Sequence, residues 1–482
     1  MVAILELQTR TPGLPGAVVA LLYVLAALSP MFAAVVTGIE PSGAPSEFAT
    51  ALGLTAAALL LLQFLSSGRF ESISGRMGID RTMGLHRIAA YVLLAFATLH
   101  PLLYLSNTLL ADPIAAWHRL LGMLASPRLR TGVIALAGLV LIVCLATIRT
   151  RPFMRYEMWR ITHGPLAIVV AGLILHHAVT AGAYSAETVL RIVWFVLAAA
   201  AAAAALLVYV VRPWRMWRED WRVERVRRVG ERVVEMILRG PPTTQLRFRA
   251  GQFIWMTLAP KRPPFHDHPF SIASSPADLP RLRLVISEAG DCTRAFEGIL
   301  PGTPVAIDGP HGSFCLPPNA SLVILIAGGV GIAPLLGVLE AAAARRDARP
   351  YRLLYAVRKQ SGLVLKDRLR ELQSQLDLSI SYLVDDDPRQ ADCDAGPLRA
   401  SFVKRLVGAS DPRSAAALIC GPPRMMEVAA DALLDAGVPP ASIFYERFDY
   451  GAGKGRLDRA RQRQALVVFL ALVVAMTTFS LR

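Results

Sequence analysis

Long apolar stretches in the first half of this chain constrain its fold more than any other feature. A helix needs roughly 20 predominantly apolar residues to cross the hydrocarbon core of a bilayer. Six stretches reach about that length, at 16–37, 49–67, 84–106, 131–148, 161–183 and 188–211. Because backbone polar groups in lipid must be satisfied within the segment itself, these stretches predict an all-α domain of six transmembrane helices over residues 1–212.

Arginines between the stretches predict how the domain is oriented. The loops at 68–83 and 149–160 are rich in arginine, whereas those at 38–48 and 184–187 contain neither arginine nor lysine. Cytoplasmic loops of membrane proteins carry an excess of positive charge. We therefore expect the N-terminus and the region after residue 212 on the cytoplasmic side of a cell inner or plasma membrane. The loop at 107–130, with three arginines, breaks this pattern.

A last apolar run, Ala465–Ser480, follows a long region of ordinary soluble composition. It is short for a span, and arginines bracket it. We predict a C-terminal transmembrane helix over 464–481, with packing beside the membrane as the alternative. The formal net charge of +15 is explained by arginines that flank the apolar runs, so nucleic acid is not expected as a partner. The five cysteines have no metal-ligand spacing, which argues against zinc or an iron–sulfur cluster.

Four histidines form two pairs with the same spacing. His86 and His100 lie 14 residues apart in the third stretch, as do His163 and His177 in the fifth. Fourteen residues return a helix to nearly the same face after a rise of roughly 21 Å. Because both stretches run in the same predicted direction, His86 comes level with His163 near the inner surface, and His100 with His177 near the outer one. Imidazole is a common axial ligand of haem iron, so two stacked haem sites are predicted.

Two alternatives accompany this interpretation. Intramembrane histidines can simply bond across helices, although ionisable groups inside spans are costly and usually functional. His176, next to His177, would be rotated about 100° from the shared face and is the alternative outer ligand. Three arginines near the inner level are candidates to meet haem propionates, or carry only the charge expected of an inner loop: Arg81, Arg87 and Arg160.

The region after residue 218 contains two patterns. Short alternating strands punctuated by Gly and Pro predict a small antiparallel β-barrel over 219–318. Over 319–455, strand–turn–helix units such as SLVILIAGGVGIAPLLG predict an α/β domain with a mostly parallel sheet. In the Gly-rich turn, backbone N–H groups and a helix N-terminus are placed to hold a nucleotide phosphate.

His268-Pro269-Phe270-Ser271 and the Ile-Ala-Ser-Ser-Pro after it resemble the flavin signature of the ferredoxin–NADP reductase superfamily, in the form found in bacterial-type ferric reductases and NADPH oxidases. The resemblance implies FAD, with Ser271 against the reactive edge of the flavin and His268 at the ring side or the phosphates. Further segments resemble the barrel signature, the pyrophosphate turn and the interdomain turn of that family: Gly251-Gln252-Phe253, Gly290-Asp291-Cys292-Thr293 and Gly309-Pro310-His311-Gly312.

The nucleotide turns also resemble that family. Ala327–Pro334, with Gly328, Gly329, Gly331 and Pro334, is similar to its nicotinamide-nucleotide turn, and Cys420-Gly421-Pro422-Pro423 to the segment beside the nicotinamide. Ser271 and Cys420 are thereby implied in the contact region between nicotinamide and flavin. Arg358-Lys359 stand where relatives place cations for the 2′-phosphate, which favours NADPH over NADH unless they are only a solvated charge pair. The alternative donor therefore stays open.

The histidine pairs are similar to those of the same family, whose paired histidines bind two b-type haems. Glu446-Arg447-Phe448 resembles the family's ending, where an aromatic residue stacks on the flavin, but here residues 449–482 follow it. The resemblance implies electron transfer from cytoplasmic NAD(P)H through FAD and two haems to an outer acceptor, either a ferric chelate or dioxygen giving superoxide. One alternative is an electron-delivery module that feeds a quinone or a partner enzyme. A haem-free transporter with a regulatory nucleotide domain is a further one.

Overall fold

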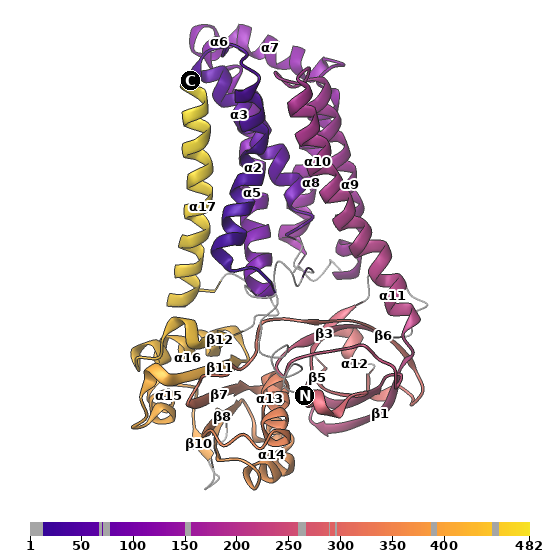
Figure 1. Ribbon diagram of the computed structural model, residues 1–482, viewed down its shortest axis with the longest axis vertical. Helices are drawn as coiled ribbons and strands as arrows, with labels where there is room; N and C mark the ends of the chain where they lie inside the picture. Colours follow the sequence, from indigo (N-terminus) through magenta and orange to yellow (C-terminus); the bar gives the residue numbers. More distant parts are fainter. Residues whose placement is uncertain are drawn as a thin grey trace. The chain divides into compact units, whose positions relative to one another are not determined.

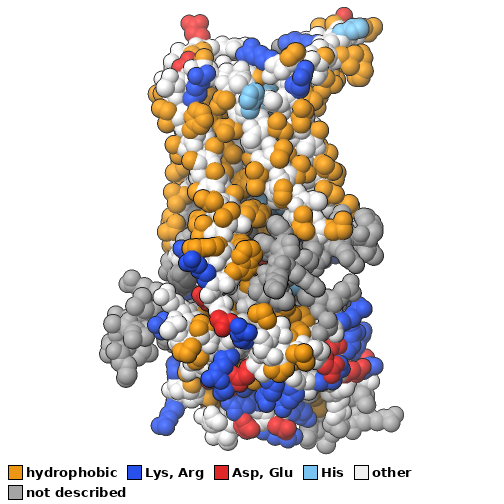
Figure 2. Space-filling model, turned by 90° about the vertical axis from the view of Figure 1, so that its right-hand side faces the viewer, with side chains coloured by type: hydrophobic (Ala, Val, Ile, Leu, Met, Phe, Trp, Pro, Cys, Tyr) orange, Lys and Arg blue, Asp and Glu red, His pale blue; other side chains and the backbone are white. Residues whose placement is uncertain are grey.

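The chain divides into two compact units. The structure, a computed structural model, describes residues 13–66, 70, 78–149, 156–258, 267–288, 290–294, 296–386, 393–445 and 453–482. One unit consists of helices and comprises 14–73, 82–211 and 462–482, whereas the other is formed mainly by 212–461 and contains two β-sheets (Figure 1). Figure 2 shows hydrophobic side chains over the helical unit and charged side chains of both signs over the other.

Seven helices of the described chain are long and apolar enough to cross a membrane, judged by length and composition. They are α2 (Gly16–Val36), α3 (Ala44–Leu62), α5 (Ile79–Leu103), α8 (Arg130–Ile148), α9 (Tyr156–Thr180), α10 (Thr188–Leu206) and α17 (Arg456–Ser480). The predicted all-α domain of apolar helices is confirmed. Helix α3 begins earlier than predicted because Pro45 is favourable in its first turn, where backbone N–H groups have no partner within the helix. The last helix is longer than its apolar run, since charged residues from Arg456 onward also adopt the helix.

Short elements continue or connect these helices. A π-helical segment (Leu207–Val211) and α11 (Arg212–Arg218) follow α10. Helices α6 (Ser106–Ala111) and α7 (Pro113–Ala125) join α5 to α8, and they contain most of the arginine-bearing loop that broke the charge pattern. Asp112 caps α7 by accepting hydrogen bonds from the backbone N–H groups of Ile114 and Ala115. The connection is therefore regular structure.

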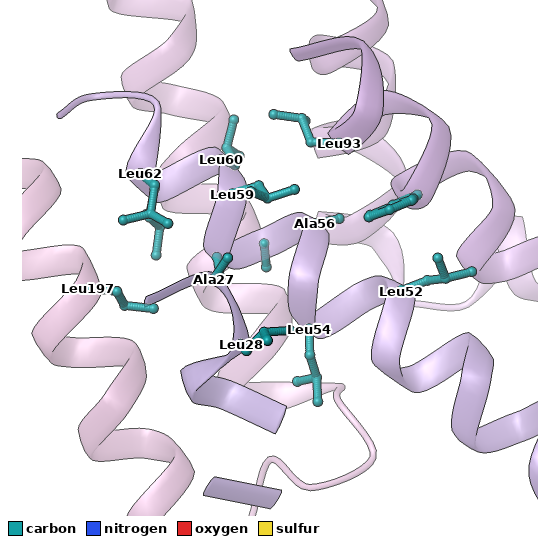
Figure 3. Packing of buried hydrophobic residues seen from close by; sticks show 14 of the residues in the cluster. Ala27, Leu28, Leu52, Leu54, Ala56, Leu59, Leu60, Leu62, Leu93 and Leu197 are labelled. Atoms are coloured by element: carbon teal, nitrogen blue, oxygen red, sulfur yellow. The ribbon is translucent and has the colours of Figure 1, made fainter. Parts of the chain in front are cut away.

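The centre of the helical unit is packed with alanine and leucine. Ala27 of α2 and Leu59 of α3 are completely buried, and Leu197 of α10 packs into the same cluster (Figure 3). Small side chains allow helix backbones to approach closely, which is how helices associate in lipid. Helix α17 contributes Phe469, Leu472, Met476 and Phe479 to the same buried cluster. The added C-terminal helix is therefore part of the bundle.

The first sheet is antiparallel and six-stranded, in the order β4-β3-β6-β1-β2-β5. Its strands are β1 (Trp221–Gly230), β2 (Val233–Arg239), β3 (Phe253–Leu258), β4 (His268–Ser271), β5 (Arg281–Ser287) and β6 (Pro304–His311). An isolated antiparallel bridge joins Ile272, just after β4, to Leu284 of β5. The antiparallel architecture is confirmed, and closure into a barrel stays a prediction.

The second sheet is parallel, in the order β10-β9-β8-β7-β11-β12. Its strands are β7 (Leu322–Gly328), β8 (Tyr351–Val357), β9 (Leu378–Val384), β10 (Cys393–Ala395), β11 (Ala415–Cys420) and β12 (Ile443–Tyr445). Helices α13 (Ile332–Ala344), α14 (Lys366–Gln373), α15 (Ala400–Val407) and α16 (Pro423–Asp435) connect them. The strand order reverses between β7 and β11, and ligands of such sheets bind outside the carboxyl ends of the strands at that reversal.

Candidate functional site

The ring of His100 on α5 is held by the neighbouring helix α3. Its Nδ1 lies 2.7 Å from the carbonyl oxygen of Ala49. A carbonyl can only accept, so Nδ1 carries the proton and Nε2 keeps a lone pair. A Cβ built on Gly53, one turn further along α3, would lie 2.6 Å from Cε1 and 2.7 Å from Nδ1 of His100. Helix α3 therefore fixes the ring and leaves Nε2 available as a ligand.

His177 on α9 is accommodated in the same manner by α8. A Cβ on Gly132 would lie 2.7 Å from both Cε1 and Nδ1 of its ring. His177 lies near His100. The Nδ1 of His177 is buried and has no hydrogen-bond partner among the described residues. His176, by contrast, is exposed, with Nδ1 3.4 Å from the hydroxyl of Thr131.

His86 is oriented by a small polar network at the end of α3. Ser66 donates its hydroxyl proton to Oε1 of Gln63 at 2.9 Å, so its oxygen can accept from Nδ1 of His86 at 3.2 Å. Gln63 in turn donates to the backbone carbonyl of His86 at 2.9 Å. This arrangement again leaves Nε2 of the histidine as the free nitrogen.

His163 on α9 lies near His86. Its Nδ1 is buried and lacks a hydrogen-bond partner within the described part of the chain. The ring of Trp159 packs beside it at 5.1 Å, and the guanidinium of Arg149 lies over that tryptophan. Among the arginines considered for propionates, Arg87 and Arg160 are half-buried and Arg81 is exposed.

Gly53→Ala is expected to disturb the His100–His177 pair alone. The new methyl group would overlap the His100 ring, so the ring must tilt away from the Ala49 carbonyl. Loss of such a supporting contact costs metal sites roughly 10- to 100-fold in affinity or activity. If the pair binds haem, as the sequence predicts, haem content and the low-temperature haem spectrum would measure the effect. Gly84→Ala on α5 is the matched control, because a Cβ there meets nothing within 4 Å.

The flavin signature lies on β4, which pairs with β3 so that Ser271 is opposite Phe253. Gly251, just before β3, has φ +97°, and a Cβ there would lie 1.9 Å from the carbonyl oxygen of Phe314. Buried Gln252 donates to the carbonyl of Gly312 at 3.0 Å. The two signatures that flank the flavin motif in sequence therefore interlock in space.

The remaining predicted flavin residues contact residues of the same domain. His268 pairs with Met256 across the strands, Pro269 and Phe270 lie within β4, and the ring of Phe270 packs against that of Phe296 at 5.7 Å. Gly290 donates its N–H to the hydroxyl of Thr293 at 3.1 Å, so the predicted pyrophosphate turn coincides with the start of the short helix α12 (Asp291–Arg294). Phe448 lies outside the described residues.

Two glycine turns meet at the reversal of the parallel sheet. The turn Gly329–Gly331 joins β7 to α13, with Pro334 in the first turn of that helix. A Cβ on Gly331 would lie 2.1 Å from the carbonyl oxygen of Cys420 at the end of β11, and one on Gly421 would lie 2.9 Å from the backbone of Gly328. Only glycine permits this backbone contact. A Cβ on Gly328 would in turn lie 2.6 Å from Pro422.

The flavin domain contacts the helix that follows the nucleotide turn. A Cβ on Gly337 of α13 would lie 2.5 Å from the carbonyl oxygen of Ile272, the residue after Ser271. One turn further, buried Glu340 accepts hydrogen bonds from Arg283 of β5 at 2.9 Å and from Arg368 of α14 at 2.8 and 2.6 Å. Neither Gly337 nor Glu340 was predicted. Both lie on one face of α13, but the sequence does not show which surface that face meets.

Arg358, the predicted phosphate contact, follows β8 and is exposed. The carboxylate of Asp386 lies 3.7 Å from its Nε, and the N–H of Asp386 donates to the Arg358 carbonyl at 2.8 Å. A carboxylate at this position was not predicted. The positive charge of Arg358 at the end of β8 is therefore partly balanced by Asp386.

Matches to known families define the class of protein: an oxidoreductase that combines a helical membrane-type domain with flavin- and nucleotide-binding domains. Residues 52–174 match the family described as ferric reductase like transmembrane component. Residues 218–314 match an FAD-binding domain, and 325–431 an oxidoreductase NAD-binding domain. The chain belongs to the NAD(P)H-dependent flavoproteins with the domain architecture of ferric reductases and NADPH oxidases.

Several curated relatives are similar to part of the chain. The 2-halobenzoate 1,2-dioxygenase electron transfer component of Burkholderia cepacia is 32% identical over 29% of this chain and 41% of its own length. The toluate 1,2-dioxygenase electron transfer component of Pseudomonas putida is 26% identical over 47% and 66%. Sulfhydrogenase 1 subunit gamma of Pyrococcus furiosus is 30% identical over 43% and 71%. The chain thus spans less than two thirds of the first two proteins.

Proposed function

We propose that this protein transfers electrons from cytoplasmic NAD(P)H through FAD and two b-type haems to an acceptor on the outer side of a membrane. The acceptor is a ferric chelate, or dioxygen that is reduced to superoxide. The observation that carries the proposal is the support of His100. Its Nδ1 is committed to the Ala49 carbonyl, and Gly53 makes room for the ring, so that Nε2 is free to bind iron.

The pairing of the four histidines supports two haems, and two of the four have the second-nitrogen contact expected of a metal ligand. Histidine ligands usually donate the second ring nitrogen to a carbonyl or another acceptor, which sets the tautomer and the orientation of the ring. His100 meets this requirement through Ala49, and His86 through Ser66. His163 and His177 come from the single helix α9, which supports one haem between each pair. When bound, haem iron supplies one-electron carriers, and flavin links them to a two-electron donor.

The residues of the soluble domains bind and orient the nucleotide and the flavin. Backbone N–H groups at Gly329–Gly331 and the N-terminus of α13 favour a phosphate group. Ser271 and Cys420 are proposed to line the contact between nicotinamide and flavin. The packing of Gly337 against Ile272 supports this role, because it ties the flavin strand to the nucleotide-binding helix. Stacking of Phe448 on the flavin stays a prediction.

Arg358→Ala is expected to lower kcat/KM for NADPH about 10- to 100-fold and to affect NADH little. A hydrogen bond to a charged group contributes about 1.5–3 kcal/mol, which corresponds to that range. Asp386→Asn should act in the opposite direction, because the carboxylate beside Arg358 would repel a 2′-phosphate. Steady-state rates with both donors measure this preference. Arg352→Ala, at the other end of β8, is the control, and equal losses for NADPH and NADH would contradict the assignment.

A difference spectrum between reduced and oxidised purified protein tests the proposed function directly. Two b-type haems should appear, and NADPH should reduce them anaerobically. In vesicles loaded with nucleotide, superoxide formation and ferric-chelate reduction outside would identify the acceptor. If neither dioxygen nor a ferric chelate is reduced, but a quinone or a partner enzyme is, the second candidate function holds. The relatives that are named electron transfer components of dioxygenases favour that candidate.

A further inference from the structure

A buried carboxylate lies on α3, the helix whose Ala49 carbonyl holds the His100 ring. Glu47, in the first turn of α3, is 1% exposed. Its Oε2 accepts from the hydroxyl of Tyr184 at 2.8 Å and from the guanidinium of Arg482 at 3.3 Å, while Oε1 accepts from the N–H of Ser42 at 3.1 Å. We call Glu47, Tyr184 and Arg482 the Glu47 cluster. It joins the start of α3, the loop between α9 and α10, and a residue two positions after the end of α17.

The members of the Glu47 cluster hold one another in place. Arg482 also donates to the hydroxyl of Tyr184 at 2.6 Å, and its guanidinium lies 4.0 Å from the centre of the Phe479 ring. Burial, followed by the hydrogen bond to Glu47, raises the pKa of Tyr184 to about 12, so the phenol stays neutral and donates to the carboxylate. The cluster therefore pairs one negative with one positive charge, and taking such a pair largely out of water is costly.

The same turn of α3 supports the ring of His100. Thr50 donates to the carbonyl of Ser46 at 2.9 Å, so its oxygen accepts from the hydroxyl of Tyr104 at 2.7 Å. The Tyr104 ring meets the His100 ring edge-on at 5.4 Å. The Ala49 carbonyl and Gly53 complete the support. Glu47 is thus within one helical turn of the Ala49 carbonyl and of Thr50, two of the groups on α3 that position this histidine.

We propose that the Glu47 cluster sets the redox potential of the haem bound by His100 and His177, with α17 supplying the balancing positive charge through Arg482. This inference rests on the proposed haem ligation. Charges interact strongly where the dielectric constant is low. A carboxylate favours the oxidised, more positive iron, whereas a guanidinium favours the reduced iron. Helix α17, whose Phe469, Leu472 and Met476 are buried in the bundle, thereby acquires a function.

Redox titration of the full-length protein in nanodiscs, followed through the haem absorbance, tests this proposal. Glu47→Gln should raise the midpoint potential of one haem, and Arg482→Gln should lower the potential of the same haem. The double variant, in which both charges are removed, should return toward the wild-type value, and Arg482→Lys should stay close to it. The other haem should not shift. A His100→Ala variant identifies which transition belongs to the His100–His177 pair.

Four outcomes would overturn the inference. Shifts in the same direction for Glu47→Gln and Arg482→Gln would indicate structural damage and not an electrostatic effect. Equal shifts of both haems would remove the link to His100. Unchanged potentials in all variants would exclude tuning while leaving the proposed function intact. Absence of haem from the wild-type protein would overturn the proposed function together with this inference, so the two failures are distinguishable.

Discussion

Replacing His100 by alanine is expected to remove one haem and to leave the other. The haem difference spectrum should lose roughly half of its amplitude, because an alanine offers the iron no axial ligand. Transfer of electrons to the outer acceptor should fall by more than the roughly 10- to 100-fold that loss of a supporting contact costs. Reduction of the flavin by NADPH should continue at its usual rate, since the two sheets belong to the residues that match FAD- and NAD-binding domains and not to the helical unit.

Matched variants separate ligation from general damage. His118→Ala changes an exposed histidine on α7 and should leave both haems bound. His176→Ala should also leave them bound, whereas His177→Ala should reproduce the loss seen with His100→Ala. His86→Ala and His163→Ala should each remove the other haem. An unchanged spectrum in the His100 and His177 variants would contradict ligation by this pair, and a loss in His176→Ala would move the ligand to the neighbouring residue.

Much of the architecture follows from sequence patterns that act locally. Apolar length determines where helices form, and strand–turn–helix order determines the parallel sheet. The equal spacing of the histidines places His86 and His100 on one face of α5 by helix geometry alone. Apolar length places the start of the seventh helix at residue 464, whereas α17 begins with Arg456. Hydropathy alone does not detect the charged first turns of this helix.

The contacts that complete the site could not be predicted, because they join residues distant in the chain. Spacing places His100 on a helix face, but only tertiary packing shows that Ala49 and Gly53 of α3 meet that face. Glu47 and Arg482 lie near opposite ends of the sequence, and neither stands in a recognisable motif. Glycines inside apolar helices, such as Gly53 and Gly132, were a usable signal, because a glycine retained in a helix interior usually serves close packing.

Gly331→Val is expected to abolish most NADPH-dependent reduction of the flavin. Even the Cβ would lie 2.1 Å from the carbonyl oxygen of Cys420 and 2.5 Å from its carbonyl carbon. Neither backbone can yield, because β7 and β11 are paired in the middle of the sheet, with Ala327 opposite Cys420. The turn that we propose to hold the nucleotide phosphates must therefore move. A misplacement of about 1 Å costs roughly 10²-fold in rate, so kcat/KM for NADPH should fall at least that far.

The effect of Gly331→Val should be confined to the first electron-transfer step. FAD content should persist, because the flavin signature lies on the antiparallel sheet, and a chemical reductant should still reduce both haems. Gly362→Ala is the matched control in the same domain, since its Cβ would meet Val357 at an ordinary 3.4 Å. Anaerobic stopped-flow measurement of flavin bleaching by NADPH separates the two variants. Normal bleaching in Gly331→Val would show that this turn does not hold the nucleotide, because its backbone cannot keep the present geometry with a side chain at that position.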